Sequence, residues 1–554
     1  MKPSKPKSGS PKNQRAAKTT ATTESMGSVG QGFSPDIDSS TKTGALRAAE
    51  RGHFNTRNRA EHPSGAKAHA DDAAVSARLK SCPVTEPAPF AVEASLSAAR
   101  SVAEGRSSSK PVPNSKAKTA AKSPTTEPQL VEIAKPVYGG QFLAHIEGKA
   151  VFVPLTLPGE QVRIRVTQSK SGYSTAELTE ILTPSPLRTS PPCPYFGACG
   201  GCNYQHTGYE NQLALKQEVL RETLERGGVA PPEEIIVLRA NPWAYRNRVR
   251  LAIDANGSIG YRSRRSHAVI PIAQCPIAAP LLLTAAHAAA DYLQRVPANL
   301  RPTELAFFCD PAESALLATF FASDSAGVRL EPLAQAIRER IPALRSAELA
   351  ADGRPGHPPR TLAQWGEASL TYPAAGFDYR VDHGAFFQVN RWLIDALVES
   401  VTVNQTGRLA WDLFAGVGLF ARKLTASFDR VVAVESAPAS KAALQHNLQG
   451  TGGQPVHADT LQFLRDQNAL SQSNKSIPDL IVLDPPRSGL GAEVTALLAS
   501  IAAPAMVYVS CDPATLARDL RALVASGYQI QSVTLADLFP QTFHLETVVH
   551  LRRA

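Results

Sequence analysis

The hydrophobic pattern divides most of the chain into three regions with different periods. Between residues 126 and 187, apolar and polar positions alternate in short stretches such as "AVFVPLTLPGEQVRIRV" and "STAELTEIL", which Gly-Gly, Pro-Gly and Lys-Ser-Gly interrupt. Alternation with a period of two, bounded by turn residues, predicts short antiparallel strands. Strands this short and evenly spaced are typical of a small β-barrel of the OB-like kind, a fold that often binds nucleic acid.

The next two regions combine strands and helices. Residues 188–385 have a helical period near 208–227 and later alternating stretches such as "YRNRVRLAID", which predicts a central α+β domain. Residues 386–554 alternate apolar runs ("LAWDLF", "VVAVE", "DLIVLDPP", "MVYVSC") with amphipathic segments. That alternation predicts an α/β domain: a Rossmann-like, doubly wound, mostly parallel sheet.

Charge is concentrated outside these regions. Residues 1–125 carry 20 Lys and Arg against 10 Asp and Glu, which leaves 38 against 39 of the chain's 58 and 49 for the rest. We interpret 1–125 as a disordered basic tail, because its composition offers too little apolar area for a core. No apolar run approaches the roughly 20 residues of a membrane span, so no membrane association is expected.

A nearly neutral body needs a local basic face if it is to bind a polyanion. Arginines at every second position of one predicted strand share a face, and a neighbouring strand adds more. The candidates are Arg246, Arg248, Arg250, Arg262, Arg264 and Arg265. Arginines that merely solvate a sheet are the alternative interpretation.

Glycines follow the first strand of the α/β region. In "WDLFAGVGLFARKL", Gly416 and Gly418 stand between a strand and a helix, where the backbone can approach a ligand closely. The next strand ends in Glu435, a residue type that binds ribose hydroxyls at this position. Gly-x-Gly-x-x-Ala also fits a nicotinamide dinucleotide site, so an iron–sulfur oxidoreductase that uses this cofactor is one alternative.

Two further strands end in residues capable of chemistry. "DLIVLDPPRSGL" delivers Asp484 and Arg487 in a loop stiffened by two prolines, and "VYVSCDPATLARDL" places Cys511 just before a helix. A cysteine at a helix start is a candidate nucleophile, although buried cysteines are more often inert. Near the end of the chain, Glu546 begins a last strand and is a candidate general base.

The remaining cysteines predict a metal site. Seven cysteines is an odd number, and three of them lie between residues 193 and 202, which favours a reducing compartment over a disulfide framework. Cys193, Cys199, Cys202 and Cys275 supply four thiolates, enough for zinc or for a 4Fe-4S cluster. The spacing does not choose between the two.

The motifs "DLFAGVGLF", "LDPPRSG", "VYVSCDPATLARDL", "FPQTFHLETV" and "GAFFQVN" together resemble the class I S-adenosylmethionine-dependent RNA uracil 5-methyltransferases, in that family's order. The resemblance covers about 128–554. It implies that Cys511 adds to carbon 6 of uracil and that Glu546 removes the proton from carbon 5. The residues it implies for contact with S-adenosylmethionine are Gln388, Phe414, Gly416, Gly418, Leu419, Glu435, Asp459 and Asp484. Leu419 departs from the polar residue of the family pattern.

The resemblance extends to the other regions. Residues 126–187 are similar to a TRAM domain, an RNA-binding module, and the cysteine pattern is similar to that of 4Fe-4S members of the family. The combination implies RNA as partner, most closely 23S rRNA with tRNA as the alternative, and a cytoplasmic monomer. Phe386 and Phe387 are candidates for stacking on a flipped uridine, with core packing expected for at least one. A catalytically silent RNA-binding protein is a further alternative.

Overall fold

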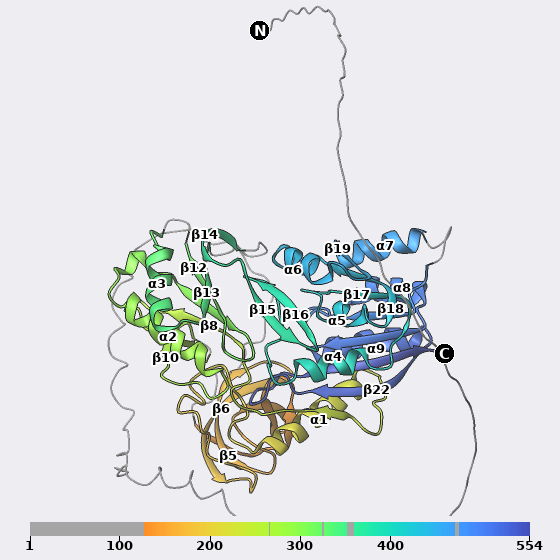
Figure 1. The fold of residues 1–554 in the computed structure, drawn as a ribbon. Coiled ribbons are helices and arrows are strands. Elements are labelled where there is room, and N and C mark those ends of the chain that lie inside the picture. Colours follow the sequence, from red (N-terminus) through yellow and green to blue (C-terminus); the bar gives the residue numbers. More distant parts are fainter. Residues whose placement is uncertain (1–126, 265, 324–325, 352–358, 471–475) are drawn as a thin grey trace, which may run out of the picture. The chain divides into compact units, whose positions relative to one another are not determined.

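The computed structural model describes residues 127–554 except 265, 324–325, 352–358 and 471–475 (Figure 1). The predicted tail and Arg265 lie outside these residues. The described part contains three large sheets and one hairpin. No helix in it combines the length and the apolar character that crossing a bilayer requires.

The first sheet is built from the alternating region. Its strand order is β1-β5-β6-β4-β3-β2, with antiparallel ladders except between β4 and β6. Along β5 every second side chain is buried, as the period of two predicts. The strands are β1 (Gln129–Glu132), β2 (Lys135–Val137), β3 (Gln141–Ile146), β4 (Lys149–Pro154), β5 (Gln161–Ser169) and β6 (Tyr173–Thr183).

The second sheet, with the order β10-β9-β8-β11-β12-β13-β14, occupies the central region. Two amphipathic helices, α2 and α3, pack on it through a shared apolar core. The elements are β8 (Arg248–Ile253), β9 (Ile259–Arg262), β10 (Val269–Pro271), α2 (Pro280–Leu293), the 3-10 turn η1 (Ala298–Leu300), β11 (Glu304–Cys309), β12 (Leu316–Ala322), α3 (Leu330–Arg340), β13 (Leu344–Ala351) and β14 (Arg360–Gly366). A hairpin of β15 (Ser369–Ala374) and β16 (Phe377–Asp382) follows.

The third sheet confirms the predicted α/β fold class. Its order is β19-β18-β17-β20-β21-β23-β22-β7, parallel from β19 to β21, and β23 is antiparallel to both of its neighbours. The strands are β7 (Ile236–Leu238), β17 (Gly407–Leu413), β18 (Phe428–Glu435), β19 (Gly453–His457), β20 (Leu480–Leu483), β21 (Ala505–Ser510), β22 (Tyr528–Ala536) and β23 (Glu546–Arg553).

Helices cover both faces of this sheet, which is why its central strands are buried throughout (Figure 1). Ala410 of β17 belongs to one apolar core and its neighbour Trp411 to the other, because successive side chains point to opposite faces. The helices are α1 (Tyr209–Arg226), α4 (Ile394–Thr402), α5 (Leu419–Leu424), α6 (Pro438–Leu448), α7 (Thr460–Leu470), α8 (Gly491–Ile501) and α9 (Pro513–Ala525).

Part of the range assigned to a central domain belongs to this third sheet. Strand β7 pairs in parallel with β22, and α1 packs against α9. Periodicity could not reveal this, because a strand of three residues carries no information about which sheet edge it joins. The domain bounds given above stay a prediction.

Candidate active site and cysteine cavity

The carboxyl ends of β17, β18, β20 and β21 form the edge at which open α/β sheets bind ligands. Gly416 and Gly418 adopt left-handed conformations with φ of 57° and 87°. The amide of Gly416 donates to Oε2 of Glu435 at 2.8 Å, so the turn after β17 is tied to the end of β18. A Cβ on Gly418 would lie 2.9 Å from Leu444, which explains the requirement for glycine.

A small cavity of about 20 Å³ lies at this edge. Five of the residues predicted to contact the cofactor line it: Gln388, Phe414, Gly416, Leu419 and Asp484. The structure thus brings together residues separated by almost a hundred positions. The hydroxyl of Tyr379 stabilises the turn after β17 by donating to the carbonyl oxygen of Leu419 at 3.0 Å.

The other three predicted contacts lie outside the cavity lining. Gly418 begins α5 behind it, and Glu435 uses its carboxylate to accept from Gly416 and, at 2.6 Å, from the amide of Ala437. Asp459 follows β19, where its carboxylate accepts from Gln462 at the start of α7. Of the two predicted stacking residues, Phe387 is buried in the core as expected, whereas Phe386 is 60% exposed at the cavity.

Three carboxyl groups lie beneath this edge, and burial favours the neutral form of each. Burial raises the pKa of Asp412 to about 8, and the nearby Asp484 and Glu435 add to the effect, although the amide of Ala421 donates to it at 2.8 Å. Burial and Glu435 also raise the pKa of Asp484. Burial and the charge of Asp484 raise the pKa of Glu546 well above its usual range, while Arg487 opposes this.

Cys511 lies at the end of β21, half-buried, beside the same charged groups. Burial, helped by the carboxylates of Glu546 and Asp484 and opposed by Arg487, raises its pKa to about 11. The expected activation by the helix start is therefore outweighed in this structure. Arg487 also donates to Nδ1 of His544 at 2.9 Å, and burial lowers the pKa of that histidine to about 4, so its ring is neutral at pH 7.

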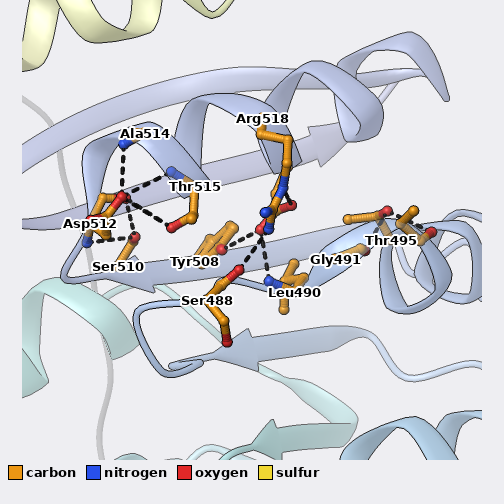
Figure 2. Close-up of polar contacts among 12 residues, drawn as sticks. Ser488, Leu490, Gly491, Thr495, Tyr508, Ser510, Asp512, Ala514, Thr515 and Arg518 are labelled. Carbon is orange, nitrogen blue, oxygen red and sulfur yellow. Dashed lines mark hydrogen bonds and ion pairs between the residues drawn. The ribbon is translucent and has the colours of Figure 1, made fainter. Parts of the chain in front are cut away.

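Helix α9 fixes the corner that holds Cys511. Asp512 caps the helix, its carboxylate accepting from the amides of Ala514 and Thr515 at 3.0 Å each, and Pro513 occupies the first turn (Figure 2). The hydroxyl of Ser510 bridges to the Asp512 backbone on the strand side. The nucleophile candidate thus stands between a buried strand and a capped helix.

The same helix holds the proline loop that carries Arg487. Thr515 donates its hydroxyl to the Arg487 carbonyl oxygen at 3.1 Å. Arg518 donates to the carbonyl oxygen of Ser488 at 2.8 Å (Figure 2). Asp519, 2% exposed, accepts from the Leu490 amide at 2.7 Å and from the Tyr508 hydroxyl at 2.9 Å. The sequence analysis missed Asp519, because a single acid in an amphipathic helix gives no signal of burial.

A residue of the first sheet also reaches this site, and the sequence analysis missed it too. The hydroxyl of Tyr138, in the turn between β2 and β3, lies 3.4 Å from the carbonyl oxygen of Cys511. Burial and the neighbouring Asp512 carboxylate raise the pKa of Tyr138, so its hydroxyl stays protonated and remains a donor. Its ring packs edge-on against Phe543 at 5.7 Å.

The four predicted metal-ligating cysteines line one cavity of about 40 Å³. Burial raises the pKa of Cys193, Cys199 and Cys202, that of Cys202 to about 12. The amide of Gly201 lies 3.4 Å from the sulfur of Cys199. Among the described residues, no three His, Cys, Asp or Glu side chains converge as ligands of a single metal ion.

The predicted arginine face is largely wrong. Arg246 is half-buried and lines the cysteine cavity, and Arg248 is half-buried with its guanidinium 4.5 Å from the ring of Phe308. Arg250 and Arg262 are exposed, but both pair with Glu304, at 2.6 and 2.7 Å. Partial burial of two arginines and the acid shared by the other two reduce the exposed positive charge that alternation along the strand suggested.

Comparisons with known proteins identify the family of this chain. The model of the tRNA (uracil-5-)-methyltransferase family matches residues 367–554, and that of the TRAM domain matches 126–179. An uncharacterized RNA methyltransferase of Streptomyces avermitilis is 34% identical, covering 76% of this chain and 98% of the relative. The 23S rRNA (uracil(1939)-C(5))-methyltransferase RlmD of Alkalilimnicola ehrlichii is 32% identical, covering 77% and 97%.

Among solved structures, the Pyrococcus abyssi tRNA (uracil-54, C5)-methyltransferase in complex with S-adenosyl-L-homocysteine matches with a TM-score of 0.61 at 21% identity. It covers 76% of this chain and 100% of that one, which supports the fold. The fold and the glycine-lined strand edge define an S-adenosylmethionine-dependent methyltransferase. The chain belongs to the RNA uracil-5-methyltransferase family: it methylates carbon 5 of uridine in RNA.

Proposed function

We propose that this enzyme methylates a uridine of 23S rRNA, with Cys511 as nucleophile and Glu546 as general base. The observation that carries the chemistry is the meeting of Cys511, Glu546, Asp484 and Arg487 at one strand edge. Glu546 and Asp484 raise the pKa of Cys511 there, and Arg487 lowers the pKa of both Cys511 and Glu546. The rRNA substrate rests on the relatives named for that activity, which match along 97% or more of their length in two cases. A tRNA substrate is the second candidate, since the matching structure carries that name.

The proposed reaction needs a temporary bond to the uracil ring, because carbon 5 is a weak nucleophile. The Cys511 thiolate forms a bond to carbon 6, and the electron pair of the ring double bond makes carbon 5 electron-rich. S-adenosylmethionine, when bound, supplies an electrophilic methyl group. Glu546 then takes the proton from carbon 5, the double bond re-forms, and the bond to sulfur breaks to release the thiolate.

The local charges suit these steps. Cys511 rests as a thiol, because burial raises its pKa to about 11. Its proton passes to solvent water as the thiolate adds to carbon 6, and the thiolate takes up a proton again after its release. Arg487 is the cation placed to stabilise the thiolate and the enolate that forms on the ring. Glu546 is 5% exposed, and burial that raises its pKa makes its ionised form a stronger base.

The test is methyl transfer from labelled S-adenosylmethionine to unmodified 23S rRNA and tRNA transcripts, followed by nucleoside identification. We expect 5-methyluridine in the rRNA and its loss in Cys511→Ala. The matched control is Cys309→Ala, a buried cysteine of β11 in the core of the second sheet, which should retain activity. Label in tRNA alone would overturn the rRNA substrate, and activity in Cys511→Ala would overturn the nucleophile.

We also propose that Cys193, Cys199, Cys202 and Cys275 hold a 4Fe-4S cluster, with zinc as the alternative. The proposal rests on the four thiols lining one cavity. In a 4Fe-4S cluster each sulfur ligand binds a different iron atom. The glycines of "ACGGC" let the chain wrap closely around it.

Iron and acid-labile sulfide content of anaerobically purified protein tests this assignment. We expect about four of each per chain, and loss of both in Cys202→Ser but not in Cys309→Ser. Zinc at one equivalent without sulfide would favour the alternative.

A further inference from the structure

The segment that leads into Glu546 is held by residues from a distant part of the chain. Asp537–Leu545 connects β22 to β23, and five of its nine residues, Asp537, Leu538, Gln541, Thr542 and Leu545, are at most 1% exposed. Because Glu546 is the first residue of β23, the conformation of this segment sets the position of its carboxylate.

Helix α1 binds the segment through two of its side chains, Lys216 and Gln212. Lys216, 1% exposed, forms an ion pair with Asp537 at 2.5 Å and donates to the carbonyl oxygen of Phe539 at 3.0 Å. One turn earlier, Gln212 exchanges two hydrogen bonds with Gln541: its amide group donates to the Gln541 side-chain oxygen at 2.9 Å, and its own oxygen accepts from the Gln541 backbone amide at 3.0 Å.

Gln541 also ties the segment to the cysteine cavity. Its carbonyl oxygen accepts from the backbone amides of Asn203 and Tyr204, at 2.9 and 3.1 Å, directly after Cys202. Tyr245, the neighbour of the cavity-lining Arg246, donates to the carbonyl oxygen of Pro540 at 3.0 Å. Gln541 adopts a left-handed backbone conformation, with φ of 68°.

This conformation needs compensation, because residues other than glycine and asparagine rarely adopt it. The hydrogen bonds made by the Gln541 side chain, amide and carbonyl provide it. Without these hydrogen bonds nothing offsets the backbone strain of the segment. The Glu546 carboxylate is then no longer held in a fixed position.

We propose that Gln541 is a positioning residue for the proton-abstraction step. Its hydrogen bonds to helix α1 and to the residues that follow Cys202 hold the segment that leads into Glu546 in place. The inference rests on the proposed function. Proton removal comes after methyl transfer, so a displaced base slows the release of Cys511 from carbon 6. The covalent adduct between protein and methylated RNA then accumulates, a result that general destabilisation would not produce.

The test uses the full chain, a 23S rRNA transcript and labelled S-adenosylmethionine. The variant Gln541→Asn tolerates the left-handed backbone, but its side chain is one methylene too short to accept from Gln212. The hydrogen bond from its backbone amide to Gln212 stays. We expect steady-state turnover to fall about tenfold or more, single-turnover methyl transfer to change less than about twofold, and the adduct stable in denaturing gels to increase at least about fivefold.

Gln212→Ala removes both hydrogen bonds of the pair and should show the same pattern at least as strongly. The double variant should resemble Gln212→Ala, because that variant already removes the bond lost in Gln541→Asn. The matched control is Gln217→Ala, which removes a hydrogen bond from the same helix to the carbonyl of Ile235 and should leave adduct levels unchanged. Equal loss of single-turnover transfer and turnover, without adduct, would overturn the inference.

Glu546→Gln separates this inference from the proposed function. If Glu546→Gln traps adduct and Gln541→Asn does not, the base stands and the positioning role fails. If Glu546→Gln loses turnover without trapping adduct, the assigned base is wrong and the inference falls with it.

Discussion

At the residue scale, the nucleophile candidate is controlled by charge more than by its place at a helix start. Sequence reasoning identified Cys511 and supposed that the helix start would favour the thiolate, whereas burial and two carboxylates raise its pKa to about 11. Arg487 is the opposing charge. The balance depends on Glu546 and Asp484, which come from other strand ends, so the local sequence around the cysteine did not contain it.

Alkylation of Cys511 should report this balance. In the free enzyme we expect the iodoacetamide rate to rise about tenfold per pH unit from pH 7 and to level off near pH 11, because only the thiolate reacts. Arg487→Gln removes the charge that lowers the pKa, so alkylation at pH 8 should slow several-fold. Arg521→Gln, an exposed arginine of α9, is the control. Mass spectrometry of the Cys511 peptide measures the rate, and an unchanged rate in Arg487→Gln would contradict the assignment.

Asp412 should make stability depend on pH. Its pKa is raised to about 8 in the folded chain from about 4 when unfolded. Between these values the unfolded state loses the proton and the folded state keeps it, so stability falls as pH rises, by up to about 1.4 kcal/mol per unit. Asp412→Asn removes this term. In thermal denaturation, the stability of the variant relative to the wild type should increase from pH 5 to pH 8 and stay level above pH 8. A stability difference that does not change with pH would refute the prediction.

At the element scale, the sequence predicted where α9 begins but not which loop its buried face contacts. Its start after Ser-Cys-Asp-Pro follows from the capping aspartate and the proline, and the structure places it there. Asp519, on the buried face of α9, contacts the loop between Arg487 and Leu490. The sequence could not predict this contact, because it depends on the distance between the loops that follow two parallel strands. The three-residue β7 gave no sequence signal for a related reason: its pairing with β22 is decided by the sheet it meets.

Gly489 is where this helix and loop meet most closely. Its φ is 71°, and a Cβ there would lie 2.5 Å from Oδ2 of Asp519 and 2.7 Å from Nη2 of Arg518. Gly489→Ala should therefore cost about 1–3 kcal/mol of stability and reduce turnover, since the clash displaces Arg487. Gly491→Ala is the matched control, because φ is 78° but nothing lies within 4 Å of its Cβ. Denaturant unfolding of both variants separates the effect of the clash from that of the left-handed backbone. Equal losses of stability in the two variants would argue against a clash at Gly489.

At the scale of the whole molecule, the first sheet is part of the active-site wall. Alternation predicted a small barrel and a basic face on the central domain, and of the arginines of that face Arg246 and Arg248 are half-buried while Arg250 and Arg262 pair with Glu304. The barrel's contact with the nucleophile corner, between residues 373 positions apart, carries no signal in a single sequence. Local patterns specify elements and their strand-end residues, whereas contacts between sheets come only from the assembled fold.

Tyr138 makes this contact testable. Its hydroxyl holds the Cys511 carbonyl oxygen from the barrel side and is protonated at all working pH values, because burial and Asp512 raise its pKa. Tyr138→Phe removes one hydrogen bond, worth about 0.5–1.5 kcal/mol, so kcat should fall about 2–12-fold while the Kd for RNA stays nearly constant. Tyr173→Phe, in β6 of the same sheet, controls for a general effect on the barrel. Weaker RNA binding with unchanged kcat would instead assign Tyr138 to the RNA surface of the barrel.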